Sequence, residues 1–442
     1  MTAATARTTA PALGTTVPAI SSTAKGDRAQ PLKVNLQKKE KLKAALDEVM
    51  EKWAPHLPGV AFGITTGEGP IYAGYAGERV YGDPESGQVG EDTTYMLYSM
   101  SKLITSLAVL QQVESGVLSY DDPETIEKYA PELLKQKVLV SYSNSEPVFE
   151  ERETPLTLRH LVTHTSGLVY WPFDAELKAY LETQRTPVMY SATVGDLEQP
   201  LRFQPGSKFA YGPGLDWAGI ILERATGKNL EQLYREKIFD PLHISPDTTF
   251  EHVSDMLERW QRTVHRDPEL KLEDPQRPTS GDLKQRKGGD GLWSTLPDYL
   301  GICAGVLASE NPGGIISPPS QAQLFLDALP KATTPDGLEQ AHQDLAGFLH
   351  HVGVNDLGPE DCGHSVAAMV IRRDAEGKRR AGSAAWIGAA RTEFCIDPKA
   401  GLAFVAMTQI ERPEDGPYDS PEPFDEFVRE MEAKLYERLH LA

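Results

Sequence analysis

Strand-like segments lie near both ends of this chain, and a long stretch of helical and loop patterns separates them. Residues 59–82, GVAFGITTGEGPIYAGYAGERVYG, are rich in β-forming residues and contain a Gly-Glu-Gly-Pro break that is typical of a hairpin. Residues 393–397 and 401–410, EFCID and GLAFVAMTQI, predict a second, central hairpin. We therefore expect an α+β fold in which one central antiparallel sheet is built from both chain ends.

Helical periodicity predicts flanking helices and a helical lobe inserted between the two halves of the sheet. Apolar residues recur at helical spacing from Leu36 to Trp53 and again from about Pro423 to His440. The segment that follows Ser99 is strongly apolar along one stripe and ends at Gly116, a helix stop signal. Further helices are expected within residues 156–168, 215–227 and 229–242. The insertion covers about residues 120–290, and an active site would lie at its seam with the sheet.

Composition limits the partners of the 442-residue chain. The formal net charge of −20 argues against binding to nucleic acid or to anionic membrane surfaces, because both require a basic face. No run approaches the ~20 apolar residues that a membrane-spanning helix needs. We expect a cytoplasmic protein whose partners are small molecules.

Cysteine and histidine spacing predicts neither disulfides nor a metal site. The three cysteines, Cys303, Cys362 and Cys395, are too few and too scattered for a disulfide framework. His160 and His164 have the i, i+4 spacing of a metal-binding pair, but no glutamate follows His160 as it does in HExxH. We expect no metal and no cofactor.

Residues 1–34 differ from the rest of the chain. They are rich in Ala, Thr and Pro, which predicts a disordered tail. They contain no continuous apolar region, which disfavours a secretory signal, whereas the lack of acidic residues before Asp27 leaves an organelle transit peptide open. The remaining residues, 35–442, are expected to form one catalytic domain.

Ser99-Met100-Ser101-Lys102 is an SxxK tetrapeptide at the start of the apolar helix described above. Residues i and i+3 share a helix face, so the Lys102 amine is expected beside the Ser99 hydroxyl. A serine is a weak nucleophile until a base takes its proton, and a desolvated lysine can be that base. The same tetrapeptide pattern at Ser22–Lys25 lacks a following apolar helix, and we interpret it as chance.

Two further segments supply candidate groups. Tyr211, in KFAYGPGLDWAG, precedes a predicted helix and could relay a proton between Lys102 and a leaving group. The small residues of GSAAWIGAARTEFCIDPKAGL, around Trp386, Gly388 and Ala389, would let a strand edge approach a substrate closely. A backbone N–H there could pair with the Ser99 N–H as an oxyanion hole.

Three other candidates have simpler interpretations. Tyr142-Ser143-Asn144 lies in a polar stretch, SYSNSEP, that predicts a surface loop. Ser166, in HTSG, lacks the GxSxG pattern of a nucleophile elbow and is better explained as a turn residue. Asp290, in GGDGLWST, could be catalytic, but its glycine neighbours first indicate a tight loop.

Together these segments resemble the serine β-lactamase and penicillin-binding-protein superfamily, in particular its esterase branch (class C-like, family VIII esterases) and fungal acyltransferases of the statin side-chain type. The resemblance runs from about Leu42 to Leu435. It rests on five blocks in the expected order: YSMSKLITSLAVLQQVESGVLSYDDP, LTLRHLVTHTSGLVY, FAYGPGLDWAGIILERATG, GGDGLWST and WIGAARTEFCIDPKAGL. It implies a β-lactamase-like fold for the catalytic domain.

The resemblance also implies roles. Ser99 matches the acylated serine, Lys102 its paired lysine and Tyr211 the tyrosine of the second motif. Trp386-Ile387-Gly388 stands where lactamases carry Lys-Thr-Gly and would contact substrate, and Ala389 would supply the second oxyanion N–H. Tyr-Gly-Pro replaces the lactamases' Tyr-x-Asn, so Pro213 cannot bind the amide of a β-lactam, nor can Trp386 grip its carboxylate.

These departures favour an apolar or bulky acyl ester as substrate. A serine carboxylic-ester hydrolase is the first interpretation, and an acyltransferase that moves an acyl group to an alcohol of a secondary metabolite is the second. Both use the same acyl-enzyme, and no residue reports directly whether water or an alcohol accepts the acyl group. A β-lactamase or peptidase comes third, and an inactive binding protein comes last because Ser99, Lys102 and Tyr211 are all present.

Overall fold

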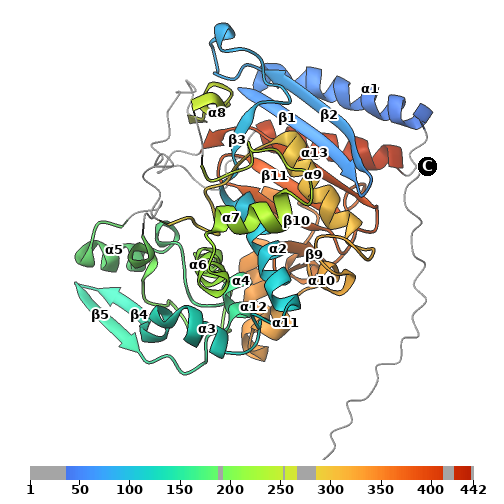
Figure 1. Ribbon diagram of the computed structural model, residues 1–442. Helices are drawn as coiled ribbons and strands as arrows, with labels where there is room; N and C mark the ends of the chain where they lie inside the picture. Colours follow the sequence, from blue (N-terminus) through green and yellow to red (C-terminus); the bar gives the residue numbers. More distant parts are fainter. Residues whose placement is uncertain (1–35, 188–192, 252–253, 266–284, 412–422, 440–442) are drawn as a thin grey trace, which may run out of the picture. The chain divides into compact units, whose positions relative to one another are not determined.

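The computed structural model describes residues 36–187, 193–251, 254–265, 285–411 and 423–439. Its centre is a seven-stranded antiparallel sheet with the strand order β2-β1-β12-β11-β10-β9-β8 (Figure 1). The strands of this sheet are β1 (Gly59–Thr66), β2 (Gly69–Gly77), β8 (Cys362–His364), β9 (Met369–Ile371), β10 (Ala384–Gly388), β11 (Thr392–Asp397) and β12 (Leu402–Met407). Strand β1 pairs with β12, so the prediction of a sheet built from both chain ends is confirmed.

Helices cover both faces of this sheet. Neighbouring residues of a strand point to opposite faces. In β1, Phe62 packs against Phe427 of α13 (Pro423–Leu439), whereas the Cα of Gly63 faces Leu300 of α9 (Leu296–Ala308). Helix α1 (Leu36–Trp53) packs against α13 and β2. Every residue of β1, β11 and β12 is buried as a result, which accounts for the nearly continuous apolar sequences of β1 and β12.

The remaining helices lie mostly between β2 and β8 in the chain. They are α2 (Ser101–Glu114), α3 (Glu124–Tyr129), α4 (Leu158–Val162), α5 (Ala175–Gln184), α6 (Gly214–Thr226), α7 (Leu230–Tyr234), α8 (Ser254–Glu258), α10 (Pro318–Gln323), α11 (Leu329–Ala332) and α12 (Pro335–Ala346). Within the described ranges, no helix combines the length and the hydropathy needed to cross a bilayer.

Three two-stranded sheets accompany the central one: β3 (Thr94–Met96) with β7 (Trp293–Thr295), β4 (Val138–Ser143) with β5 (Glu146–Glu150), and β6 (Val264–His265) with β13 (Ile410–Glu411). The β4–β5 pair corrects the expectation of a loop at SYSNSEP, which is the end of one strand, a turn and the start of the next. Asn144 and Ser145 have φ of 51° and 64° in that turn. Two positive φ values are what a tight hairpin turn requires.

Candidate active site

Ser99 lies in a single 3₁₀ turn, Tyr98–Met100, that leads directly into α2. The side chain of Lys102, in the first turn of α2, places its Nζ 3.0 Å from the Ser99 Oγ. Lys102 is only 2% exposed, so protein groups must replace the water around its ammonium group. The Gly289 carbonyl, at 2.7 Å, and the Tyr170 hydroxyl, at 3.4 Å, both accept hydrogen bonds from it.

The turn that presents Ser99 is strained and firmly held. Tyr98 has a φ of 49°, a left-handed conformation that costs energy for a side chain with a Cβ. Its ring is buried in a cluster with Met96, Met256, Trp260, Trp293 and Ala390. The Leu97 N–H donates to the carbonyl of Leu292, and the Met100 N–H donates to that of Leu97. Packing and backbone hydrogen bonds therefore hold Ser99 in place.

Tyr211 reaches the same serine from the other lobe. Its hydroxyl donates to the Ser99 Oγ at 2.5 Å. The backbone around it is held by His164, whose carbonyl accepts from the Ala210 N–H and whose Nδ1 accepts from the Gly212 N–H. A Cβ at position 212 would lie 2.0 Å from the carbonyl oxygen of Leu168, so this close approach requires glycine.

The HTSG segment is thus a support for Tyr211. Ser166 is 1% exposed and its Oγ accepts from the Leu168 N–H, as expected for a turn residue. His160 is part of the capping box at the start of α4, where it contacts Thr157. The two histidines of the i, i+4 pair therefore have different structural roles. His160 caps the start of α4, and His164 packs behind the ring of Tyr211.

Two buried residues of the site were missed in the sequence. Tyr170 lies beside Lys102, and its hydroxyl donates to Asp216 Oδ2 at 2.8 Å. Asp216 is completely buried and its Oδ1 accepts from the Gly289 N–H at 3.0 Å. The sequence did carry one signal for Asp216: it is an acidic residue on the apolar face of α6, five residues after Tyr211.

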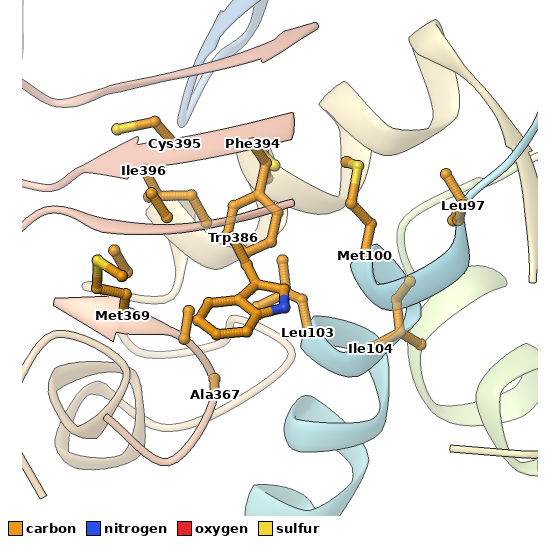
Figure 2. Close-up of a cluster of buried hydrophobic side chains, with 14 of the residues drawn as sticks. Leu97, Met100, Leu103, Ile104, Ala367, Met369, Trp386, Phe394, Cys395 and Ile396 are labelled. Atoms are coloured by element: carbon orange, nitrogen blue, oxygen red, sulfur yellow. The ribbon is translucent and has the colours of Figure 1, made fainter. Parts of the chain in front are cut away.

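Trp386 is packed inside the protein, behind Tyr211. It is 3% exposed, and its ring lies 5.4 Å from that of Tyr211 and 5.7 Å from that of Phe348. Figure 2 shows it between the strands of the sheet and the first turns of α2, with Leu103 close to the indole ring. Neighbouring rings therefore cover the indole, and contact of Trp386 with a substrate stays a prediction.

Two histidines belong to the same aromatic cluster. The ring of His164 lies 4.8 Å from that of Tyr211, and the ring of His364 lies 5.6 Å from that of Trp386. Burial lowers the pKa of His364 to about 4, and burial together with His364 and Lys102 holds the pKa of His164 well below its usual value. Both imidazoles are neutral near pH 7, so the ammonium of Lys102 faces uncharged rings on this side.

The end of β10 lies directly against the turn that carries Ser99. A Cβ at Gly388 would be 2.4 Å from the carbonyl oxygen of Leu97, so only glycine allows the strand to come this close. Ala389, which follows, is exposed, and Ile387 is half-buried. Among the turn and loop hydrogen bonds of the described ranges, none is donated by the backbone N–H of Ser99 or of Ala389.

The other sequence candidates lie elsewhere. Asp290 forms a buried ion pair with Lys287 at 2.9 Å, and its neighbour Gly289 is the residue that contacts Lys102. Tyr142 and Asn144 belong to the β4–β5 hairpin, where Tyr142 contacts Tyr180. The second SxxK pattern, at residues 22–25, lies outside the described residues.

The chain is similar to known proteins over most of its length. The model of the "Beta-lactamase" family matches residues 42–425. Monacolin J acid methylbutanoyltransferase from Aspergillus terreus is 32% identical over 365 residues, which cover 78% of this chain and 82% of that protein. Lovastatin esterase from Penicillium rubens is 31% identical over 356 residues, which cover 78% of this chain and 87% of that protein.

Solved structures agree with the sequence relatives. The unliganded simvastatin synthase LovD from Aspergillus terreus superimposes with a TM-score of 0.75 at 26% identity, covering 92% of this chain and 100% of that chain. EstCE1, described as a hydrolase with promiscuous acyltransferase activity, shares the fold with a TM-score of 0.65 at 20% identity, covering 88% of this chain and 99% of that one.

The low pKa of His364 predicts a pH dependence of stability. Between its pKa of about 4 when folded and the usual value of ~6.5, the unfolded chain binds a proton that the folded protein does not. This residue should therefore cost about 2 kcal/mol of stability when the pH falls from 7 to 5. Denaturant unfolding of His364→Gln at both pH values should show a weaker dependence than the wild type. His56→Gln, at an exposed position, is the control, and an unchanged slope in His364→Gln would contradict the assignment.

Proposed function

This chain belongs to the beta-lactamase family, and we propose that it is a serine carboxylic-ester hydrolase that forms an acyl-enzyme on Ser99. The observation that carries the proposal is the convergence of two proton-bearing groups on one hydroxyl: the Tyr211 hydroxyl lies 2.5 Å, and the Lys102 amine 3.0 Å, from the Ser99 Oγ. Such contacts between a nucleophile and its neighbouring bases are the geometric requirement of nucleophilic catalysis.

The steps follow from the positions of these atoms. Ser99 Oγ attacks the ester carbonyl carbon and gives its proton to the Lys102–Tyr211 pair. The N–H groups of Ser99 and Ala389 stabilise the negative oxygen of the tetrahedral intermediate. The pair then returns the proton to the departing alkoxide as the C–O bond breaks, which leaves the acyl group on Ser99. A water molecule attacks the acyl-enzyme in the same way, and the carboxylic acid and free serine are regenerated.

Acyl transfer is the second candidate, and the names of the relatives fit it as well as they fit hydrolysis. Their names include both a methylbutanoyltransferase and an esterase, so the two outcomes occur among proteins of similar identity to this chain. In a transferase the hydroxyl of an alcohol replaces water in the second half of the reaction. The proton then passes from that alcohol to the Lys102–Tyr211 pair, and a new ester forms.

The surroundings support an apolar acyl group. Phe173 is 43% exposed, and its ring lies 6.4 Å from that of Tyr211, so an apolar surface borders the reacting centre. Ile387 is half-buried at the end of β10, and with Gly388 we assign it to the substrate-contacting edge. The preceding residue of β10, Trp386, supports this edge by packing against the ring of Tyr211. No basic side chain replaces the lysine that a Lys-Thr-Gly motif would supply here.

A cytoplasmic location is also part of the proposal. Cys303, Cys362 and Cys395 are all buried free thiols. Unpaired cysteines are usual in proteins of reducing compartments.

Ser99→Ala should abolish turnover of p-nitrophenyl esters without changing the thermal melt, because a partly exposed hydroxyl contributes little to packing. A fluorophosphonate probe should add one label to the wild type, and peptide mapping should place it on Ser99. Ser166→Ala, in the HTSG turn, is the control and should still be labelled. Labelling of the Ser99→Ala variant would remove Ser99 as nucleophile.

Lys102→Arg should be nearly as inactive as Lys102→Ala, because a guanidinium keeps the charge but cannot give up its proton. Tyr211→Phe removes only the hydroxyl and should slow the acylation step by about 100-fold, with little change in the melt. Stopped-flow release of p-nitrophenol measures that step. If Lys102→Arg keeps near-normal rates, lysine acts only through its charge, and Tyr211 becomes the base.

Phe173→Ala should weaken the use of long or branched acyl esters more than that of acetyl esters. The loss should correspond to about 1–2 kcal/mol in kcat/KM, the value of the covered apolar surface. Phe149→Ala removes another exposed phenylalanine, on β5, and should leave kcat/KM unchanged for both long and acetyl esters. Equal losses on short and long esters would exclude Phe173 from acyl recognition.

The choice between water and alcohol is tested by one assay. Purified protein is incubated with an apolar p-nitrophenyl ester, with and without a polycyclic alcohol, and the products are separated by chromatography. Free acid in equal amounts in both samples supports hydrolysis, whereas new ester at the expense of free acid supports transfer. Release of neither product would contradict the proposed function.

A further inference from the structure

Asp216 is a buried carboxylate whose two partners are both neutral. It is 0% exposed on α6, where apolar neighbours such as Trp217 and Ile220 are also buried. Its Oδ2 accepts from the Tyr170 hydroxyl at 2.8 Å, and its Oδ1 accepts from the Gly289 N–H at 3.0 Å. A buried charge of this kind costs stability unless it interacts favourably with another charge nearby.

That other charge is the ammonium of Lys102. Tyr170 and Gly289 are also the two residues, besides Ser99, that accept hydrogen bonds from Lys102 Nζ. Asp216 and Lys102 are thus joined by two bridges, one through the phenol oxygen of Tyr170 and one through the backbone of Gly289. A Cβ at Gly289 would lie 2.7 Å from Asp216 Oδ2, so this approach also depends on glycine.

The carboxylate fixes the direction of the hydrogen bonds in the first bridge. A phenol has one proton, and a carboxylate can only accept, so the Tyr170 proton points to Asp216. The lone pairs of the Tyr170 oxygen are then left for Lys102. Burial, followed by the negative charge of Asp216, raises the pKa of Tyr170 well above its usual value, so the phenol stays neutral.

We propose that Asp216 is a positioning residue of the catalytic site, which holds Lys102 beside Ser99 and stabilises its ammonium form through Tyr170 and Gly289. The inference rests on the proposed function, because it assigns Asp216 to the support of the Lys102–Tyr211 pair. Asp216 touches neither Ser99 nor the place of the substrate, and it acts through the orientation and charge of the lysine.

Other titratable groups lie around this pair in the part of the chain that the structure describes. Those that face Lys102 or Asp216 are Tyr170, Tyr211, His164, Tyr234 and the Lys287–Asp290 pair. Burial holds His164 neutral and raises the pKa of Tyr234 far above its usual range. Lys287 and Asp290 are bound to each other. Asp216 is therefore the carboxylate that both bridges connect to Lys102.

Asp216→Asn tests the proposal, because it keeps the size of the side chain but removes the charge and turns one acceptor into a donor. The rate of acylation by p-nitrophenyl acetate should fall by about 100-fold, as expected when a reacting group is misplaced, with little change in KM. The rising limb of the pH–rate profile should move to lower pH, because the variant removes a buried negative charge beside the reacting groups. Loss of structure alone would not move this limb.

Asp298→Asn is the matched control. Asp298 is also buried, and its carboxylate accepts from the Ser245 N–H and from the hydroxyls of Ser245 and Thr248, away from the site. The Asp298→Asn substitution should lower the melting temperature without moving the rising limb of the pH–rate profile. If Asp216→Asn does not fold, Tyr170→Phe replaces it: this variant breaks one bridge and should move the limb in the same direction by a smaller amount.

The outcomes separate this inference from the proposed function. A slower Asp216→Asn enzyme with a limb shifted to lower pH supports the positioning role. An unchanged rate, or a slower rate with an unmoved limb, overturns it, as does an equal shift in Asp298→Asn. In each of these cases Ser99 labelling of the wild type by the fluorophosphonate is unaffected. Failure of that labelling would instead overturn the proposed function.

Discussion

The burial of the Lys102 ammonium is the constraint to which the rest of the site is adapted. A lysine that is 2% exposed loses most of its hydration, and protein groups must replace it. Its acceptors come from three separate parts of the chain: Ser99 in the preceding turn, Tyr170 after the HTSG segment and Gly289 before β7. Because each of them must reach a single Nζ, the lysine ties the inserted lobe to the sheet-bearing part of the fold.

Such convergence requires unusually close approaches of the backbone, and the glycines of the site provide them. Gly212 lies against the carbonyl of Leu168, and Gly388 lies against that of Leu97. The first approach holds Tyr211 over the serine, and the second brings β10 beside the turn that presents it. Any side chain at either position would push one catalytic element away from the other, and a misplacement of 1 Å is enough to cost about 100-fold in rate.

The features that the sequence predicts well are those set by local pattern. The two hairpins, the terminal helices and the i, i+3 relation of Ser99 to Lys102 follow from periodicity and turn residues within short segments. The contacts of Tyr170 and Asp216 join positions 102, 170, 216 and 289, which lie far apart in the sequence. An acid on the apolar face of α6 marks Asp216 as unusual, but it does not reveal these partners. Trp386 shows the same limit: its place in the chain predicted a wall of the substrate site, but Phe348 and Tyr211 cover its ring in the folded protein. The β4–β5 hairpin was missed because β5, EPVFE, is exposed along its whole length and does not resemble a strand of a buried sheet.

The replacement of a lysine by Trp386 changes the electrostatics of the site as well as its shape. The aromatic cluster behind Tyr211 consists of uncharged groups, since burial keeps both His164 and His364 neutral. A negative group on the acyl side of a substrate would meet these uncharged rings and would lose its hydration on binding. An uncharged acyl chain has no charged group whose hydration it could lose, and it gains apolar contact, for instance with Phe173. We propose that the buried residues around Lys102, which strengthen its interaction with Asp216 through Tyr170, also favour an apolar acyl group. In the proposed function, proton transfer and acyl specificity both depend on the exclusion of water from the space around Tyr211, where the Lys102 ammonium lies 4.9 Å from the centre of the tyrosine ring.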